Sequence, residues 1–169
     1  MKVNVAQVRR NENGTAHFDL EEDFSSFESE LEGVSFAAPV HVHLQVSNLG
    51  KSLLVLGKIG TEFKVECGRC LDDFIYPMDL SFEDEWVYGT QIAEEQSETA
   101  LIFEKDEIEI SERIFEQIVL ALPMRFICSP ECKGLCPVCG VNRNHTACDC
   151  VDVPVDPRLA SLAQWTQRD

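Results

Sequence analysis

The sequence lacks any apolar stretch long enough to cross a membrane. A membrane-spanning helix needs about 20 consecutive apolar residues, and the chain of 169 residues contains no such run. The opening residues, MKVNVAQVRRNENG, also lack the apolar segment of a secretory signal. We therefore expect no membrane contact and a cytoplasmic location, where the reducing environment disfavours structural disulfides.

Basic residues are scarce. Lys and Arg total 14 against 30 Asp and Glu, which gives a formal net charge of −16. Acids concentrate in residues 21–32 and 83–109, whereas residues 111–169 are nearly balanced, with six bases and seven acids. Sequence-independent binding of nucleic acid needs a broad basic surface, and this composition excludes one. The acidic segments are either solvated faces or a surface that docks a basic protein.

Groupings typical of catalytic sites are missing as well. The histidines are His17, His41, His43 and His145, and the middle two share one face of a predicted strand. No glycine-rich phosphate loop is present, and the carboxylates fall in no recognisable catalytic motif. We expect a protein that is not an enzyme and has no small-molecule substrate.

Alternation of apolar and polar residues predicts most of the fold. Period-two patterns over residues 39–46, 52–59, 61–67 and 73–89 predict strands that follow one another along the chain. Because each strand is joined to the next by a short connection, we expect a mostly antiparallel sheet.

Helical signals are fewer. Residues 17–31 fit a partly helical connector, and Ser111 predicts the N-cap of a helix with one apolar face. Residues 156–157 open a short C-terminal helix, whereas residues 91–100 lack periodicity and predict an exposed loop.

The predicted fold class is α+β. We expect a mostly antiparallel sheet domain with few helices over residues 1–123. Residues 124–169 then form a cysteine-rich, zinc-binding appendage, which has no core of its own and packs on the same domain.

What the sequence has in abundance is cysteine. Two CxxC pairs, CGRC and CPVC, have the two-residue spacing that points both sulfurs at one ion, as tetrahedral zinc requires. The compact arrangement is two zinc sites of four thiolates each. One comprises Cys136, Cys139, Cys148 and Cys150, and the other Cys67, Cys70, Cys128 and Cys132.

The spacing leaves other arrangements open. Cys128 or Cys132 can trade places with Cys148 or Cys150, and His145 can replace a sulfur. CGRC can also be two reduced thiols at a strand end or a redox centre. A thioredoxin-type centre places its cysteines at the start of a helix, however, and the residues after CGRC continue as a strand.

Basic side chains near the cysteines have two interpretations. A zinc ion held by four thiolates carries a formal charge of −2, and Arg69, Lys133 and Arg143 are placed to offset it. Together with Arg158 they are also the candidate patch for contact with RNA or a partner protein.

Three segments together resemble the YceD family, bacterial and plastid proteins named for the accumulation of large-subunit (23S) ribosomal RNA. They are CGRCL at residues 67–71, CSPECKGLCPVCGVNRNHTACDC at 128–150 and DPRLASL at 156–162. The resemblance implies an α+β fold and an accessory role in 23S rRNA processing and large ribosomal subunit biogenesis. It matches all eight cysteines to the family pattern and implies no catalytic residue.

Two hypotheses are therefore carried forward. The first is a non-catalytic ribosome-biogenesis factor stabilised by structural zinc, which contacts large-subunit rRNA or docks ribosomal or processing proteins. The second is a zinc-ribbon regulator or redox-sensing chaperone whose cluster releases zinc on oxidation. Thiol reactivity distinguishes the two.

Overall fold

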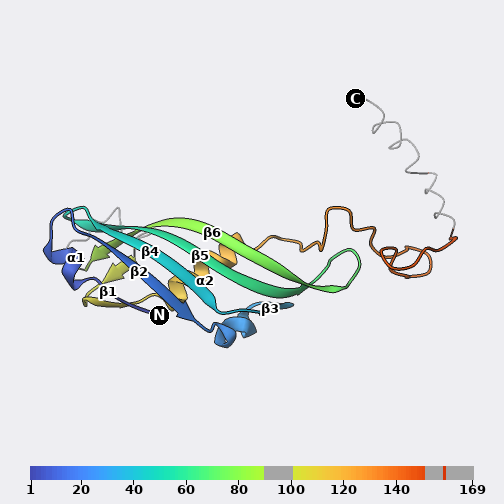
Figure 1. Ribbon diagram of the computed structural model, residues 1–169, viewed down its shortest axis with the longest axis horizontal. Coiled ribbons are helices and arrows are strands. Elements are labelled where there is room, and N and C mark those ends of the chain that lie inside the picture. The colour runs from blue at the N-terminus through green and yellow to red at the C-terminus, as the bar shows by residue number, and fades with distance from the viewer. Residues whose placement is uncertain (90–100, 151–157, 159–169) are drawn as a thin grey trace, which may run out of the picture. The chain divides into compact units, whose positions relative to one another are not determined.

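The computed structural model describes residues 1–89, residues 101–150 and Arg158. The chain divides into two compact units (Figure 1). The sheet unit comprises Met1–Glu66 and Asp73–Phe126, and the cysteine unit comprises Cys67–Asp72 and the chain from Ile127 onward. The tip of one hairpin thus groups with the cysteine unit, although the sequence alone placed it in the sheet domain. The predicted loop at residues 91–100 lies outside the described residues, and so does the short helix expected to begin at residues 156–157 and run through Ala163, except for Arg158.

The sheet unit is built on one six-stranded sheet. Its order is β2-β4-β5-β6-β7, with β3 paired to β5 off this path, and β1 and β8 form a separate pair. All pairs are antiparallel except β6 with β7. The predicted α+β class with a mostly antiparallel sheet is confirmed. The elements are β1 Lys2–Asn4, α1 Ala6–Arg10, β2 Thr15–Glu22, η1 Ser25–Glu30, β3 Val34–Phe36, β4 Val40–Asn48, β5 Ser52–Glu66, β6 Asp73–Tyr88, β7 Leu101–Phe103, β8 Glu107–Glu109 and α2 Ser111–Ala121.

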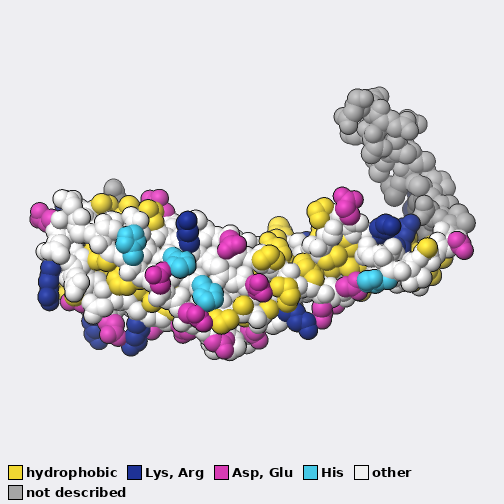
Figure 2. Space-filling model, viewed as in Figure 1, with side chains coloured by type: hydrophobic (Ala, Val, Ile, Leu, Met, Phe, Trp, Pro, Cys, Tyr) yellow, Lys and Arg dark blue, Asp and Glu magenta, His cyan; other side chains and the backbone are white. Residues whose placement is uncertain are grey.

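Alternation along the strands decides which face of the sheet is buried. In β4 every second residue from Val40 to Val46 is buried, and β5 and β6 alternate in the same way. Ile114 and Ile118 of α2 belong to the same apolar cluster, and Phe115 stacks on Phe27 of η1 with ring centroids 4.6 Å apart. Burial of each such side chain stabilises the fold by about 1.5–3 kcal/mol. Figure 2 shows the opposite, solvent-facing side, where histidine and acidic side chains are interspersed with apolar ones.

Backbone hydrogen bonds determine which residues of β6 face the edge of the sheet. The N–H of Leu49 donates to the carbonyl of Ser52 (2.9 Å), so even-numbered residues of β5 bond β4 and odd-numbered ones bond β6. These odd-numbered residues pair with even-numbered residues of β6. The N–H and C=O groups of odd-numbered β6 residues therefore point away from β5. Pro77, which has no N–H, occupies one of these outward positions, as proline does in sheets.

Two predicted elements differ from the structure. Residues 52–59 and 61–67 were expected as separate strands, but a single strand, β5, runs from Ser52 to Glu66. It stays extended because β3 replaces β4 as the partner of its second half. The helical connector expected at residues 17–31 is wrong for its first half, which is strand β2 paired along its whole length with β4.

The helices of the described residues are short. The predicted N-cap is wrong: Ile110 occupies that position, and Ser111 is the first helical residue. The Ser111 hydroxyl instead hydrogen-bonds to the carboxylates of Glu22 (2.7 Å) and Glu109 (2.8 Å). The preference of serine for capping its own helix is overridden by hydrogen bonds to residues that are distant in the sequence or lie outside the helix. Within the described part of the chain, no helix has the length and apolar character needed to traverse a bilayer.

Substitution of two glycines in β5 would test how tightly this sheet is packed. A Cβ on Gly57, which faces the core, would lie 2.1 Å from the ring of Phe82, whereas a Cβ on the outward Gly60 would lie 3.3 Å from Asp79 Oδ1. We expect Gly57→Ala to lower the free energy of unfolding by about 1–3 kcal/mol. Gly60→Ala should change it by less than about 0.5 kcal/mol. Urea unfolding measures the free energy of both variants. In a Phe82→Leu background, Gly57→Ala should lower the free energy of unfolding by a smaller amount, because the ring that the new methyl group contacts is absent. Equal losses in the two glycine variants would contradict this packing.

Candidate metal centres

The described part of the cysteine unit has cysteine where a domain normally has an apolar core. Its buried side chains are those of Cys67, Cys70, Cys132 and Cys136. All eight cysteines of the chain are free thiols. The cohesion of this unit therefore depends on what its sulfur atoms bind.

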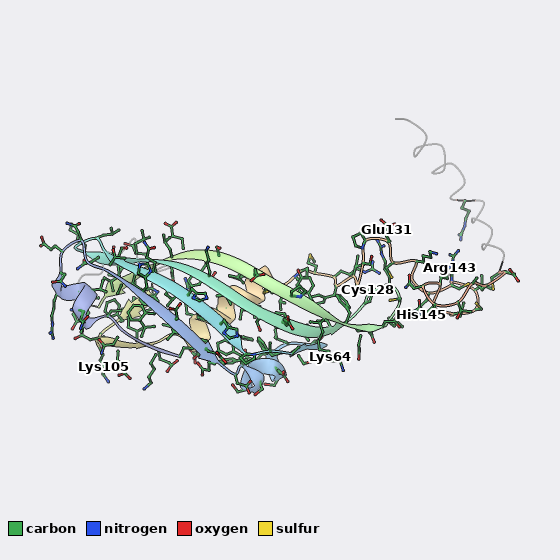
Figure 3. The ribbon with its side chains drawn as sticks, in the orientation of Figure 1. Lys64, Lys105, Cys128, Glu131, Arg143 and His145 are labelled. Carbon is green, nitrogen blue, oxygen red and sulfur yellow. The ribbon has the colours of Figure 1, made fainter. Side chains whose placement is uncertain are left out.

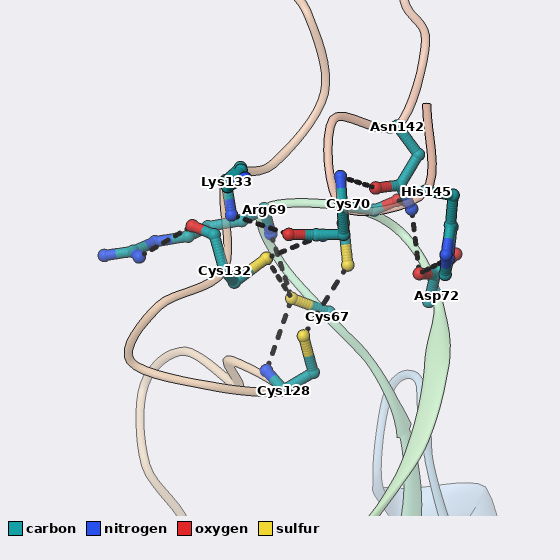
Figure 4. A network of polar contacts seen from close by, with 10 residues as sticks. Cys67, Arg69, Cys70, Asp72, Cys128, Cys132, Lys133, Asn142 and His145 are labelled. Carbon is teal, nitrogen blue, oxygen red and sulfur yellow. Dashed lines mark hydrogen bonds and ion pairs between the residues drawn. The ribbon is translucent and has the colours of Figure 1, made fainter. Parts of the chain in front are cut away.

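Four of these sulfurs form the hairpin tetrad, which comprises Cys67, Cys70, Cys128 and Cys132. Their Sγ atoms all lie within 4.8 Å of one another, and Figure 4 shows them pointing toward a common centre. The Sγ of Cys67 is 3.9 Å from that of Cys132, and the Sγ of Cys70 is 3.7 Å from that of Cys128. A tetrahedral ion with sulfur ligands at about 2.3 Å spaces them about 3.8 Å apart. A disulfide would need about 2.05 Å. The tetrad can hold one metal ion.

Hydrogen bonds to the sulfurs favour the charged thiolate. The N–H groups of Cys128 (3.4 Å) and Arg69 (3.5 Å) donate to Cys67 Sγ, and the side-chain amide of Asn144 donates to Cys132 Sγ (3.3 Å). Burial alone would raise the pKa of Cys67, but these backbone donors lower it to about 6. The bond from Asn144 likewise lowers the pKa of Cys132. A metal ion binds the deprotonated sulfur, and these donors favour that form of the cysteine.

Arg69 ties together the two chain segments that carry the hairpin tetrad. Its guanidinium donates to the carbonyls of Pro130 (3.3 Å) and Cys132 (3.2 Å), and its own carbonyl accepts from the N–H of Leu135 (3.0 Å). Gly134 has a φ of 68°, and a Cβ there would lie 3.0 Å from the Arg69 carbonyl oxygen. A glycine is needed for both reasons.

Asp72 anchors the other side of the hairpin tip. Its carboxylate accepts from the side-chain amide of Asn142 (2.8 Å) and contacts His145 Nε2 (2.9 Å). These bonds lower the pKa of Asp72, with His145 the larger cause. His145 was considered as a metal ligand from the sequence, but it stands outside both groups of sulfur atoms. Sequence reasoning missed the supporting roles of Asp72 and of Asn142 and Asn144.

The remaining cysteines form the knuckle tetrad: Cys136, Cys139, Cys148 and Cys150. Their Sγ atoms also lie within 4.8 Å of one another. The first two sit in a tight turn, in which the N–H of Gly140 donates to the carbonyl of Cys136 (2.9 Å) and Gly140 has a φ of 75°. The N–H groups of Cys139 and Val138 lower the pKa of Cys136 to about 6. The structure thus gathers the cysteines in the two sets of four that their spacing predicts, and their role as ligands stays a prediction.

In each tetrad one thiol has a lowered pKa and loses its proton readily, whereas another has a raised pKa and loses its proton with difficulty. The N–H of Asp72 lowers the pKa of Cys70, but burial and the neighbouring thiols outweigh it and raise the pKa to about 12. In the knuckle tetrad, the thiol of Cys139 and burial raise the pKa of Cys150 to about 12. Negative sulfurs this close repel one another. A divalent cation removes this repulsion, so metal binding should release protons.

The basic residues expected at an RNA or partner surface have different surroundings. All three of Arg69, Lys133 and Arg143 are exposed, but the guanidinium of Arg69 is hydrogen-bonded to backbone carbonyls. Arg158 is exposed but interacts with another residue of the chain, so it is not a free cation. In the sheet unit, Lys64 and Lys105 lie at separate ends (Figure 3). Contact of these residues with RNA or protein stays a prediction.

Comparison with known families identifies the chain. Residues 55–165, which include both tetrads, match the family described as Large ribosomal RNA subunit accumulation protein YceD. The chain belongs to the YceD family. No solved structure is significantly similar to this YceD-family chain.

Three relatives show how much of the chain is matched in bacterial and in chloroplastic proteins. An uncharacterized protein of Mycobacterium tuberculosis is 27% identical over 97% of this chain and 80% of its own length. The uncharacterized protein YlbN of Bacillus subtilis is 25% identical over 100% of this chain and 98% of its own. A chloroplastic protein of Zea mays, named Large ribosomal RNA subunit accumulation protein YCED homolog 1, is 47% identical over 26% of this chain and 15% of its own length.

The two tetrads predict metal stoichiometry and the order of metal loss. We expect two ions per chain, and one in each of Cys67→Ser and Cys136→Ser, by elemental analysis of the purified protein. Cys139 and Cys150 are exposed, whereas Cys67, Cys70 and Cys132 are buried. A chelator should therefore strip the knuckle tetrad first, giving two kinetic phases. Cys67→Ser should keep only the fast phase and Cys136→Ser only the slow one.

Thr146→Ala is the matched control, because this exposed residue lies between Cys139 and Cys148 in sequence and belongs to neither group of ligands. It should keep both ions and both phases. A single ion shared by the chain, or loss of both ions in either cysteine variant, would contradict two separate sites.

Proposed function

We propose that this chain is a non-catalytic accessory factor for the accumulation of large-subunit ribosomal RNA in the cytoplasm, with a cysteine unit held by two structural zinc ions. The observation that carries the proposal is the family match over residues 55–165. The chloroplastic relatives of Zea mays and Arabidopsis thaliana carry the same function in their names. The role in 23S rRNA processing belongs to this proposal.

Zinc is the metal that this donor set favours. Four cysteine sulfurs in tetrahedral spacing are typical of structural zinc, and iron is the alternative for such a site. The zinc-bound protein should be colourless, whereas iron bound to thiolates absorbs visible light. Four protein ligands also leave no coordination position for water, so the ions would stabilise structure and would not activate a nucleophile.

The distribution of charge supports a division of labour between the units. The described Lys and Arg side chains of the cysteine unit are all exposed, but Arg69 and Arg158 have interactions within the chain, so Lys133 and Arg143 are the ones that can approach phosphate. The sheet unit carries most of the acidic residues, which repel nucleic acid. We therefore assign any direct rRNA contact to the cysteine unit, and the docking of ribosomal or processing proteins to the sheet unit.

Depletion of the protein tests the proposed function. The ratio of large-subunit to small-subunit rRNA should fall in depleted cells. The wild-type chain and Thr146→Ala should restore it, and the double variant Cys67→Ser/Cys136→Ser should not, because the cysteine unit loses both ions. Sizing of rRNA precursors by gel electrophoresis then shows whether processing is affected. An unchanged rRNA ratio on depletion would refute the accessory role.

Direct RNA contact has its own test. Lys133→Glu/Arg143→Glu should weaken binding of large-subunit rRNA fragments in a gel shift and make it less dependent on salt, because two phosphate contacts are lost. If the variant binds as the wild type does, the cysteine unit does not contact RNA through these side chains.

The exposure of the knuckle tetrad favours one second candidate, a zinc-ribbon regulator or redox-sensing chaperone. Cys139 and Cys150 are exposed, and accessible thiolates are the ones that oxidants reach. On this hypothesis, mild peroxide ejects zinc from the knuckle tetrad and exposes apolar surface, while rRNA levels do not respond to depletion. Retention of both ions in peroxide would exclude it.

A further inference from the structure

The sheet unit presents a long edge of β6 that no strand of the described residues covers. β5 pairs with Asp73–Val87 on one side of β6, but on the other side β7 pairs only with Trp86–Tyr88. In Figure 1, β6 forms the upper edge of the sheet over most of its length. The odd-numbered residues of this edge direct their backbone groups outward. The N–H groups of Asp79, Ser81 and Glu83 have no hydrogen-bond partner in the described part of the chain.

The side chains along this edge are strongly acidic on one face. Asp79, Glu83 and Glu85 project from the solvent-facing side of the sheet, and the first two are exposed. None of the three forms an ion pair with another described residue. On the other face of the same strand, Leu80 and Phe82 are half-buried and border the apolar core. The edge therefore offers carboxylates on one side and apolar surface on the other.

From this edge we infer a docking site for an extended, basic polypeptide segment of a partner protein, which adds to the sheet as a strand beside residues 77–85 of β6. Unpaired backbone groups of an exposed edge strand are the template for such addition. Side chains of an added strand alternate between the two faces. The partner segment would alternate basic residues, opposite Asp79 and Glu83, with apolar residues, beside Leu80 and Phe82. Lys58 of β5 pairs with Ser81, so the residue opposite Ser81 should be neutral.

Charge disfavours the other occupants of this edge. An antiparallel pairing of two copies about Ser81 would place Asp79 of one copy opposite Glu83 of the other, and like charges directly opposed destabilise a sheet. Nucleic acid is disfavoured because its phosphates would be repelled by the same carboxylates. The edge at β2 is less suitable for a basic segment, because its acids already have partners: Asp19 contacts His43, and Glu21 lies 3.5 Å from His41.

The inference deepens the proposed function and shares its premise that the sheet unit docks a protein, but its test does not depend on rRNA. The probe is a synthetic peptide long enough to span Pro77 to Glu85, in which valine alternates with polar residues: lysine opposite Asp79 and Glu83, and serine opposite Ser81. It is added to the full-length, metal-loaded chain at low salt. We expect saturable binding and slower hydrogen exchange at the amides of Asp79, Ser81 and Glu83, followed by nuclear magnetic resonance.

Two controls separate strand addition from simple charge attraction. A peptide of the same sequence with alternate backbone nitrogens methylated keeps its charge but cannot complete the ladder, so it should bind at least about tenfold more weakly. Ser81→Pro removes an outward N–H at a position equivalent to Pro77, so the chain should fold and lose the peptide. Asp79→Lys/Glu83→Lys should also lower affinity at least about tenfold, whereas Asp19→Lys on β2 should not.

Equal affinity for the methylated peptide, or unaltered binding to Ser81→Pro, would overturn strand addition. So would protection of the same amides in a dimer without peptide, since a second copy would then occupy the edge. Failure of peptide binding with a normal rRNA response to depletion would reject this site alone. Peptide binding without an rRNA response would reject the accessory role and leave the docking site intact.

Discussion

The closeness of four sulfur atoms is the constraint on which the cysteine unit depends. No apolar side chain in its described part is buried, except for the cysteines themselves. Sulfurs within 4.8 Å of one another cannot all carry charge without a cation between them. With an ion bound as we propose, the unit would be stabilised by electrostatic attraction to that ion, in place of the usual removal of apolar surface from water. Backbone N–H groups and Asn144 aim at the sulfurs in advance, which lowers the cost of deprotonating them.

Much of the fold and of both tetrads could be predicted from the sequence, because these features follow from local patterns. Alternation revealed β4, β5 and β6, and the CxxC spacing indicated two pairs of neighbouring cysteines, whereas the division into two sets of four was one of the arrangements that the sequence left open. The rest depends on contacts between distant residues. Asn144 binds the sulfur of Cys132, and Asp72 receives Asn142 and His145, although no local motif marks any of them. Ser111 shows the same limit, since it resembles an N-cap but finds carboxylates from other strands.

The sheet unit and the cysteine unit divide the chemistry of the chain. The sheet unit has a conventional apolar core on one face of its sheet, with acidic groups along the edge of β6 that the described strands leave unpaired. The cysteine unit is close to charge-balanced and exposes Lys133 and Arg143. Arg69 is also a basic residue of the cysteine unit, but its guanidinium donates hydrogen bonds to carbonyl groups of the loop that carries Cys132. A basic residue near thiolates can thus act by fixing backbone geometry as well as by offsetting charge.

The hairpin tetrad has a consequence for the order of events as the chain is synthesised. Cys67 and Cys132 are 65 positions apart, so the hairpin tip that carries Cys67 leaves the ribosome well before its partner sulfur is made. The sheet around β5 and β6 can form first, with half of a metal site waiting at its tip. Closing so long a loop is entropically unfavourable, and capture of the proposed ion would supply the compensating free energy. On the proposed metal binding, folding of the cysteine unit would therefore depend on the metal supply of the cell after each round of translation.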